Sequence, residues 1–237
     1  MKVLVACEES QAVTIEFRQL GHEAYSCDIV ECSGDHPEWH IMRDVRPLLG
    51  GQCEFETMDG TKHRVYGKWD MIIAFPPCTY LTVTGNRWFN IGRYGEKAVQ
   101  RQRDRGQAID FFMALVNADC PRIAIENPIG VMSTHYRKPD QIIHPYYFAA
   151  KEGDENCERK ATCLWLKGLK PLKYEIKFMP RVVEYKNGKG TDSPWHVNTM
   201  KMPTEERAKA RSKTFHGVAK AMAEQWGEGG IANERQF

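Results

Sequence analysis

The sequence predicts an α/β fold built on a mainly parallel sheet, and three stretches of the 237-residue chain support this prediction. Residues 71–75 form a continuous apolar run, which is typical of a central strand covered on both faces. A strand at 3–7, a helix and a strand at 22–28 form an opening βαβ unit. Residues 122–125 are a further short apolar strand. Together they indicate the sheet of a nucleotide-binding domain.

Length and composition indicate a globular protein with one sizeable core, since 42% of the residues are hydrophobic and 27% are charged. No run is long enough to cross a bilayer, and residues 1–6 fit a first strand better than a signal peptide. The eight cysteines are scattered rather than densely spaced, so we expect reduced thiols and a cytoplasmic protein. The net charge of +2 says little about partners.

The opening βαβ unit has features of a nucleoside site. Ser10 is the expected cap of a helix that ends at Gly21, and the next strand closes on Asp28, which is placed to accept hydrogen bonds from ribose hydroxyls. The unit lacks a Gly-x-Gly-x-x-Gly motif, so S-adenosylmethionine fits better than a dinucleotide. Asp44 is a second acidic candidate for the cofactor. The alternative at this point is an ordinary βαβ unit with a chance aspartate.

Four residues in this region have side chains that can bind zinc: Cys27, Cys32, His36 and His40. The gap between the two cysteines is wider than the usual two residues, and Cys27 falls within the predicted strand. We therefore predict no metal site here.

Two of the predicted strands end in residues that carry chemistry. The strand at 71–75 is stopped by two prolines, and Cys78 follows them. The strand at 122–125 ends in Glu126. Because the carboxyl ends of parallel strands share one edge of a sheet, both side chains are expected at that edge. A buried cysteine without a function is the alternative, but the strand and the paired prolines favour a positioned nucleophile.

A basic and aromatic segment follows Cys78. Six arginines and lysines between 87 and 105 are opposed by two acidic residues and interleaved with three aromatics. This pattern predicts a nucleic-acid surface, with cations for phosphates and rings for stacking, and a solvated helix face is the alternative. The predicted contact residues are Thr79, Asn86, Arg87, Arg93, Lys97 and Arg101.

The remaining segments are predicted to surround this sheet. Residues 52–66 read as a hairpin that turns at Asp59-Gly60, residues 109–116 as a core helix and residues 162–166 as a strand. Residues 167–202 lack periodicity and are predicted to form a small lobe. Helices follow in 203–237, the first with Thr204 as its expected cap.

Phe75-Pro76-Pro77-Cys78 and the later Glu126-Asn127-Pro128 resemble, in the same order, the Pro-Cys and Glu-Asn motifs of DNA (cytosine-5)-methyltransferases. The resemblance covers residues 1–166 and the closing helix, and the small size is similar to phage-encoded members. It implies a Rossmann-like S-adenosylmethionine-dependent methyltransferase fold, with 1–166 as the catalytic domain, 167–202 as a target-recognition lobe and 203–237 closing the catalytic domain. It further implies double-stranded DNA as the partner, a monomer, and the cytoplasm of a bacterial or phage-infected cell.

The resemblance also implies roles for residues. Cys78 would add to C6 of a flipped-out cytosine, and Glu126 would bond to N3 and the exocyclic amine. One of Arg159 and Lys160 would replace the arginine that holds the base. The expected cofactor residues are Cys7, Glu8, Glu9, Asp28, Ile29, Asp44, Phe75, Pro76 and Gly217.

Three motifs depart from the family pattern. Residues 6–10 stand where the family has Phe-x-Gly-x-Gly, residues 158–162 replace Gln-x-Arg-x-Arg, and residues 215–219 only echo Gly-Asn-Ser-Val-Pro. The departures leave open a catalytically idle DNA-binding relative, and an RNA cytosine methyltransferase is a further alternative. An amino-methyltransferase is disfavoured because Phe75 stands where its amine-binding polar residue belongs. The recognition sequence and the identity of the transferred group, a plain methyl or a related one, stay open.

Overall fold

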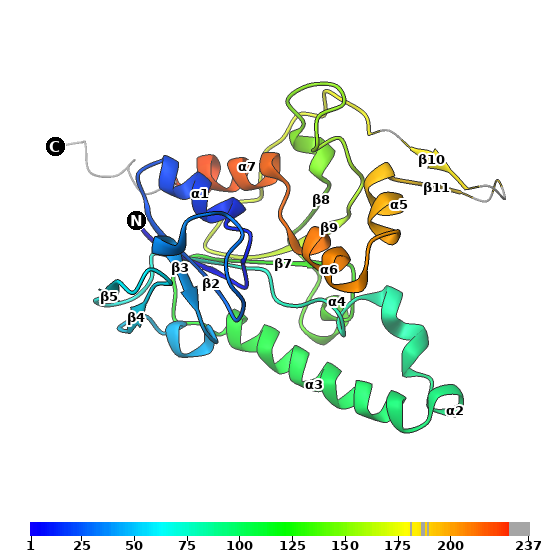
Figure 1. Ribbon diagram of the computed structural model, residues 1–237, viewed down its shortest axis with the longest axis horizontal. Coiled ribbons are helices and arrows are strands. Elements are labelled where there is room, and N and C mark those ends of the chain that lie inside the picture. Colours follow the sequence, from blue (N-terminus) through cyan, green and yellow to red (C-terminus); the bar gives the residue numbers. More distant parts are fainter. Residues whose placement is uncertain (181, 186–187, 189, 228–237) are drawn as a thin grey trace.

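The computed structural model describes residues 1–180, 182–185, 188 and 190–227. Its centre is a seven-stranded sheet (Figure 1). The strands of this sheet are β1 (Lys2–Ala6), β2 (Glu23–Asp28), β3 (His40–Met42), β6 (Met71–Ala74), β7 (Ile123–Pro128), β8 (Gln141–Ile143) and β9 (Thr162–Lys167).

The order of the strands identifies the fold. They lie in the order β3-β2-β1-β6-β7-β9-β8. From β3 to β7 all neighbours are parallel, whereas β9 runs antiparallel to both β7 and β8. A parallel sheet with one reversed strand in this place is the Rossmann-like sheet of S-adenosylmethionine-dependent methyltransferases. The predicted fold class is therefore confirmed.

Helices cover both faces of the sheet, which explains why the central strands β1 and β6 are apolar on both faces. One face packs against α3 (Glu96–Val116) in a core that contains Leu4 and Phe112. The other face packs against α1 (Ala12–Gln19) and α7 (His216–Gly227), with Phe17 and Trp226 in the core (Figure 1). Each of these four large side chains is almost fully buried, which stabilises the fold by roughly 1.5–3 kcal/mol per residue.

Smaller elements surround this three-layer body. The remaining helices are α2 (Ile91–Tyr94), α4 (Met132–His135), α5 (Pro194–Met200), α6 (Thr204–Ser212) and the 3₁₀ helices Pro37–Trp39, Arg46–Leu48, Val83–Phe89 and Pro145–Phe148. Two hairpins stand apart from the sheet, β4 (Glu54–Glu56) with β5 (Lys62–Arg64) and β10 (Val183–Glu184) with β11 (Thr191–Asp192). In Figure 1, α2 and the β10–β11 hairpin both project from the right side of the molecule. No helix in the described ranges is both long and apolar enough to cross a membrane.

Most predicted elements are present, including the hairpin at 52–66, where Gly60 adopts a left-handed φ of 84° in the turn. The short strands β3 and β8 and the helix α5 were not predicted. Gly21, with a φ of 79°, ends α1 as expected, but Pro203 occupies the N-cap position of α6 and Thr204 is its first residue, so that predicted cap was wrong. The domain boundaries at 166 and 202 stay predictions, and residues 228–237 lie outside the described part of the chain.

The start of α1 is capped differently from the prediction. Gln11, in a left-handed conformation, occupies the N-cap position, and Ser10 makes no capping bond. The acceptor is instead the Glu8 carboxylate, which receives the backbone N–H groups of Val13 at 2.6 Å and of Thr14 at 3.2 Å. A longer side chain can reach N–H groups that lie further into the helix, and the carboxylate also suits the positive end of the helix dipole.

Candidate active site

The thiol and the carboxylate of the predicted reaction centre lie at the same edge of the sheet. Ala74, the last residue of β6, is level with Ile125 of β7, so Glu126 emerges beside the residue that follows β6. The chain then turns over Pro76 and Pro77 to reach Cys78, which is exposed. The buried Asn127 side chain holds this turn in place, because its Nδ2 donates to the carbonyl oxygen of Pro76 at 2.8 Å.

Lys160 faces this edge of the sheet. It shares one pocket with Glu126 and Thr162. The apolar wall of that pocket comes from the residue after β6, from the end of β8 and its following turn, and from the start of α7 and the link before it. Its ammonium group donates to the main-chain carbonyl of Arg211 at 3.0 Å. The same ammonium group lies 5.8 Å from the ring centroid of Trp195 and 5.9 Å from that of Phe215. One hydrogen bond and two aromatic faces therefore orient it.

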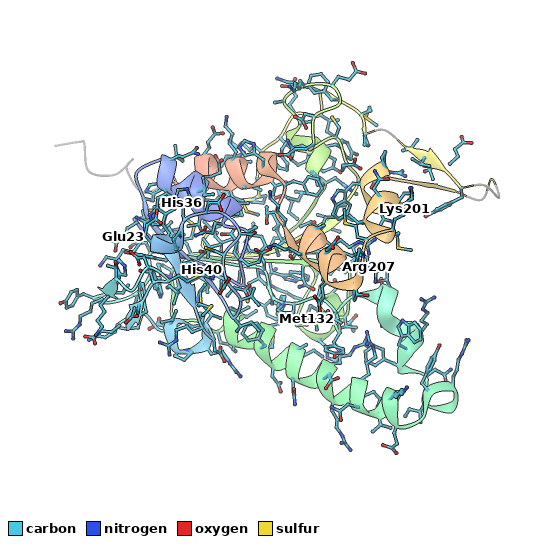
Figure 2. The ribbon with its side chains drawn as sticks, in the orientation of Figure 1. Glu23, His36, His40, Met132, Lys201 and Arg207 are labelled. Atoms are coloured by element: carbon cyan, nitrogen blue, oxygen red, sulfur yellow. The ribbon has the colours of Figure 1, made fainter. Side chains whose placement is uncertain are left out.

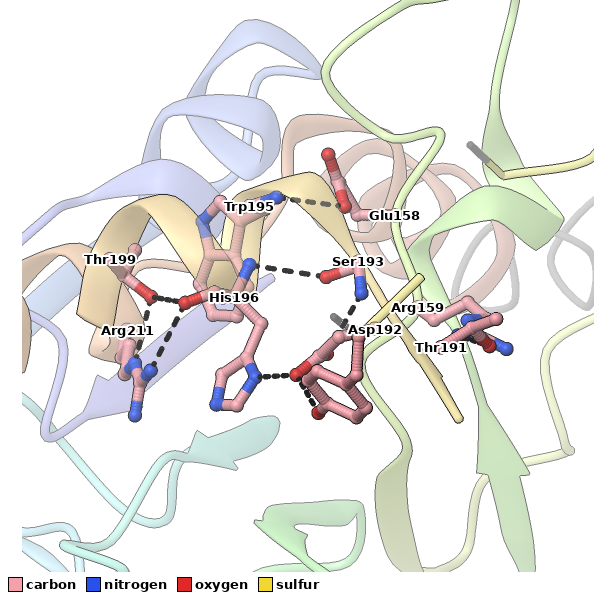
Figure 3. A network of polar contacts seen from close by, with 10 residues as sticks. Glu158, Arg159, Thr191, Asp192, Ser193, Trp195, His196, Thr199 and Arg211 are labelled. Carbon is pink, nitrogen blue, oxygen red and sulfur yellow. Dashed lines mark hydrogen bonds and ion pairs between the residues drawn. The ribbon is translucent and has the colours of Figure 1, made fainter. Parts of the chain in front are cut away.

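Arg159 points elsewhere. Its Nη2 donates to Thr191 Oγ1 on β11 at 2.8 Å, so its guanidinium is bonded to the projecting hairpin (Figure 3). Of the two residues between which the sequence did not decide, Lys160 is the one beside Glu126.

The charges around Cys78 oppose one another. The surrounding protein raises the pKa of the Cys78 thiol, and the Glu126 carboxylate raises it further, whereas the cations of Lys160 and Arg211 lower it. Burial also raises the pKa of Glu126, and Lys160 and the Thr162 hydroxyl work against this. A raised pKa favours the protonated carboxyl group, which can donate a hydrogen bond to a ring nitrogen.

A second pocket, of about 290 Å³, lies over the ends of β1, β2 and β3. It gathers four of the predicted cofactor residues, namely Cys7, Asp28, Ile29 and Asp44. Asp28 Oδ1 accepts the Ile29 N–H at 2.7 Å, which fixes the carboxylate. Burial raises the pKa of Asp28, whereas hydrogen bonds from Arg46 lower that of Asp44. Two carboxylates beside the apolar side chains of Ile29, Val45 and Phe111 suit the ribose hydroxyls and the adenine ring of S-adenosylmethionine.

The two acidic residues that follow Cys7 lie outside this lining. Glu8 is buried beneath α1 as its cap, and burial raises the pKa of Glu8 to about 7. Glu9 Oε2 accepts the Ser33 hydroxyl at 2.5 Å, and its other oxygen is buried without a hydrogen-bond partner among the described residues. The structure thus gives Glu8 a role in the β1–α1 turn.

The other predicted cofactor residues are spread along the sheet edge. Phe75 lines the pocket of Glu126 and Lys160, and Pro76 is buried in the turn before Cys78. Gly217 is packed against its neighbours, since its N–H donates to Asn156 Oδ1 at 2.7 Å and a Cβ would lie 2.5 Å from the Phe148 carbonyl oxygen. Residue 217 therefore has to be glycine, because α7 packs closely against Phe148 and Asn156 at this point.

The basic segment divides into two groups. Arg101 Nη2 donates to the Thr79 carbonyl at 3.1 Å, and Arg105 donates to the Tyr80 carbonyl at 2.8 Å and to Asn86 Oδ1 at 2.7 Å. The Arg105 guanidinium also stacks 3.4 Å from the Phe89 ring centroid. These two arginines fasten the segment after Cys78 to α3, and Thr79 and Asn86 receive their hydrogen bonds.

The second group is exposed. Arg87, Arg93 and Lys97 have no ion-pair partner among the residues that the structure describes. Arg87 lies 4.7 Å from the ring of Trp88, whose side chain is 42% exposed. Cations next to an exposed ring suit a nucleic-acid contact.

His36 and His40, two of the four residues whose side chains can bind zinc, lie close to β2 and β3 (Figure 2). His40 is buried, with one ring nitrogen 2.8 Å from Ser26 Oγ and the other 2.9 Å from the Val30 carbonyl oxygen. His36 is stacked on Trp39 with ring centroids 3.8 Å apart. Within the described ranges, no three His, Cys, Asp or Glu side chains form a group that could hold a metal ion.

Comparison with known proteins identifies no family for this chain. No family model matches it, and no curated protein matches it. Among solved structures it is similar to a candidate DNA modification methyltransferase encoded within a prophage of E. coli, at 13% identity and a TM-score of 0.39. The match covers 78% of this chain and 52% of that protein, so the chain spans about half of its length.

Sequence reasoning missed Arg211, Trp195 and Phe215, which gather around Lys160. They come from α5, α6 and the link to α7, between 35 and 55 residues further along the chain, so no local spacing connects them to Lys160. The only signal in the sequence is the motif echo at 215–219.

Proposed function

We propose that this chain is an S-adenosylmethionine-dependent DNA methyltransferase that modifies C5 of cytosine. The observation that carries the proposal is the placement of an exposed thiol, Cys78, beside a carboxyl group of raised pKa, Glu126, at the carboxyl edge of the sheet. Transfer to an exocyclic amine needs neither a thiol nor a carboxyl group that stays protonated. Transfer to C5 of cytosine needs both.

The roles of the residues follow from the chemistry of cytosine, whose C5 is a weak nucleophile. The Cys78 thiolate adds to C6 and forms a carbon–sulfur bond, while Glu126 donates to N3, so that electron density is placed at C5. S-adenosylmethionine, when bound, supplies an electrophilic methyl group. C5 takes up the methyl group, and the sulfonium sulfur keeps the electron pair of the broken bond as a neutral thioether. A base then removes the C5 proton, the bond to Cys78 breaks, and N3 returns its proton to Glu126, which restores the thiolate and leaves 5-methylcytosine.

Access to the reaction centre requires movement. The pocket that contains Glu126 and Lys160 has free space of about 20 Å³, roughly the room of one water molecule. Ser212, Thr214 and Phe215, on the α6–α7 link, form part of its wall. A flipped-out pyrimidine therefore enters only when this link moves away from Glu126.

Double-stranded DNA is the proposed substrate. The exposed cations Arg87, Arg93 and Lys97 belong to the α2–α3 region, which projects from the same side as the β10–β11 hairpin (Figure 1). A duplex between these two projections would present a base to Cys78. The Arg159–Thr191 bond ties that hairpin to the segment that carries Lys160.

The proposal is tested by mass spectrometry of nucleosides from DNA incubated with the enzyme and isotopically labelled S-adenosylmethionine, with matched RNA and a Cys78→Ala variant as controls. The expected product is labelled 5-methylcytosine from DNA, and none from the variant. Labelled N4-methylcytosine or N6-methyladenine would identify an amino-methyltransferase. Label in RNA but not in DNA would show that RNA is the substrate. No transfer to either nucleic acid would favour a catalytically idle, DNA-binding relative of the methyltransferases.

A further inference from the structure

A larger cavity lies next to the pocket of Glu126 and Lys160, which we call the target pocket. This side cavity has a volume of about 610 Å³ and is bordered by α1, α5, α6, the link between α6 and α7, and by Glu155 and Glu158. The target pocket has free space of only about 20 Å³. Because a cavity of about 150 Å³ is enough to hold benzene, the side cavity can receive an aromatic ring, whereas the target pocket cannot hold a pyrimidine as it stands.

The two spaces share one wall, which is the link between α6 and α7. Thr214 and Phe215, both on this link, line the target pocket as well as the side cavity. The ring centroid of Phe215 lies 5.4 Å from that of Trp195, which also lines the side cavity, and 5.9 Å from the Lys160 ammonium group. Phe215 therefore stands between the two spaces, and movement of its ring towards the side cavity enlarges the target pocket.

The link is fixed at both ends. At the α6 end, Arg211 Nε donates to Thr199 Oγ1 on α5 at 3.0 Å (Figure 3). At the α7 end, the N–H group of Gly217 donates to Asn156 Oδ1 at 2.7 Å. Residues 213–215 lie between these two points and outside both helices. The link can therefore move while α6 and α7 keep their places.

We propose that Phe215 is a gate of the target pocket, and that the side cavity is the space into which its ring moves when a base enters. This inference rests on the proposed function, since the entering base is the flipped-out cytosine. The closed position is stabilised by the contact of the ring with Trp195 and by the cation–aromatic contact with Lys160. Departure of the ring removes one of the two aromatic contacts of Lys160, and that side of the ammonium group is then free to face the base.

The test measures how fast a thiol placed inside the target pocket can be alkylated. Val218 lines the target pocket but not the side cavity and is 6% exposed, so Val218→Cys places a reporter thiol behind the Phe215 ring. Iodoacetamide alkylates the thiolate and releases iodide, and mass spectrometry quantifies the peptide that contains position 218. Every further variant carries this reporter, and all are compared at one pH without DNA or S-adenosylmethionine.

Two substitutions change the gate in opposite directions. Ala210→Trp fills the side cavity from α6 and should slow alkylation roughly five- to tenfold, because the Phe215 ring then has no space to enter. The matched control is Ala208→Trp, at an exposed position of the same helix that does not line the cavity, and its rate should equal that of the reporter protein. Phe215→Ala removes the ring and should raise the rate roughly tenfold.

The inference would be overturned by a rate in Ala210→Trp that equals or exceeds the rate in Ala208→Trp. A rate in Phe215→Ala no higher than that of the reporter protein would overturn it as well. Thermal unfolding identifies a variant that fails to fold. If Ala210→Trp does so, Ala12→Phe, which fills the same cavity from α1, replaces it with the same expected result.

This experiment does not depend on methyl transfer. If the protein proves not to modify cytosine, the alkylation rates still report whether Phe215 closes the target pocket. Conversely, a chain that methylates cytosine while filling the side cavity leaves the reporter rate unchanged retains the proposed function and loses this inference.

Discussion

The two halves of the sheet edge are built in different ways. One half lies over β1, β2 and β3 and is an open pocket of about 290 Å³ formed mostly by residues 7–46. We call it the donor half, because it is the proposed site of the methyl donor S-adenosylmethionine. The half over β6, β7 and β9, the target half, has free space of about 20 Å³ and draws its lining from residues between 75 and 222. Short-range βαβ contacts therefore form the donor half, whereas the target half depends on long-range contacts and has to open.

The comparison predicts that a substitution in one half can impair methyl transfer without changing cofactor binding in the other half. Glu126→Gln should lower the rate of methyl transfer by on the order of 10²- to 10³-fold, because a neutral amide cannot protonate or charge-compensate N3. The affinity for S-adenosylmethionine should stay within a factor of two or so of the wild-type value. Single-turnover kinetics and calorimetry measure the two effects, and a parallel loss of donor affinity would show that the halves are not separable.

The β1–α1 turn, next to the donor half, should make the stability of the protein depend on pH through Glu8. Its pKa is raised by burial from 4.5 to about 7 in the folded chain, so the folded state holds a proton that the unfolded state has released in this range. The free energy of unfolding of the wild type, relative to Glu8→Gln, should therefore fall as the pH rises from 4.5 to 7, by up to about 3 kcal/mol.

Urea denaturation of both proteins at three pH values measures this difference. A difference that stays constant over this range, or that grows in favour of the wild type towards pH 7, would contradict the burial of Glu8 beneath α1.

A substitution at Asp28 tests the opposite case, in which cofactor binding is the property expected to change. Asp28→Ala removes an acceptor for ribose hydroxyls from the donor pocket and should weaken binding of S-adenosylmethionine by about 1–3 kcal/mol. Asp110→Ala, an exposed aspartate on α3, is the matched control. Calorimetry that shows equal donor affinity in the two folded variants would remove Asp28 from the site.

The smallest effect is expected on the approach to the target half. Replacing Arg87 and Arg93 with Gln should lower the slope of log affinity for DNA against log salt by roughly 2, without changing thermal stability. Replacing Arg105 should instead lower the melting temperature, since Arg105 bonds to the Tyr80 carbonyl and to Asn86. Equal salt slopes in the wild type and in the variant with both arginines replaced would indicate that Arg87 and Arg93 lie on a solvated surface and do not contact DNA.

The contrast between the halves also explains what the sequence could predict. Residues 3–7 and 71–75 reveal their strands, because apolar runs are needed to bury both faces of a parallel sheet, and residues 123–125 are a shorter run of the same kind. Residues 22–28 were predicted instead from their place after the helix that ends at Gly21. β3 and β8 have three residues each and form by pairing with strands already in place, so local sequence hardly marks them. The α1 cap was misassigned because Glu8 reaches Val13 through a turn that spacing alone does not reveal.

The candidate site shows the same limit. Of the nine predicted cofactor residues, four lie in one pocket, because each directly follows or lies close to a strand end. For Arg159 and Lys160 the sequence could not decide, since their separation comes from contacts with Thr191 and Arg211, 32 and 51 residues away. The roles of these residues in catalysis stay predictions.

The central claim is that Cys78 bonds to C6 of the target base. A duplex in which 5-fluorocytosine replaces cytosine tests this directly, because fluorine cannot leave C5 as a cation and the adduct cannot resolve. The account predicts a protein–DNA species that requires S-adenosylmethionine, survives denaturing electrophoresis, and is absent with Cys78→Ser, since a hydroxyl is far less ionised than a thiol. A wild-type enzyme that methylates cytosine at C5 yet leaves no trapped species, or an adduct that persists with Cys78→Ser, would contradict it.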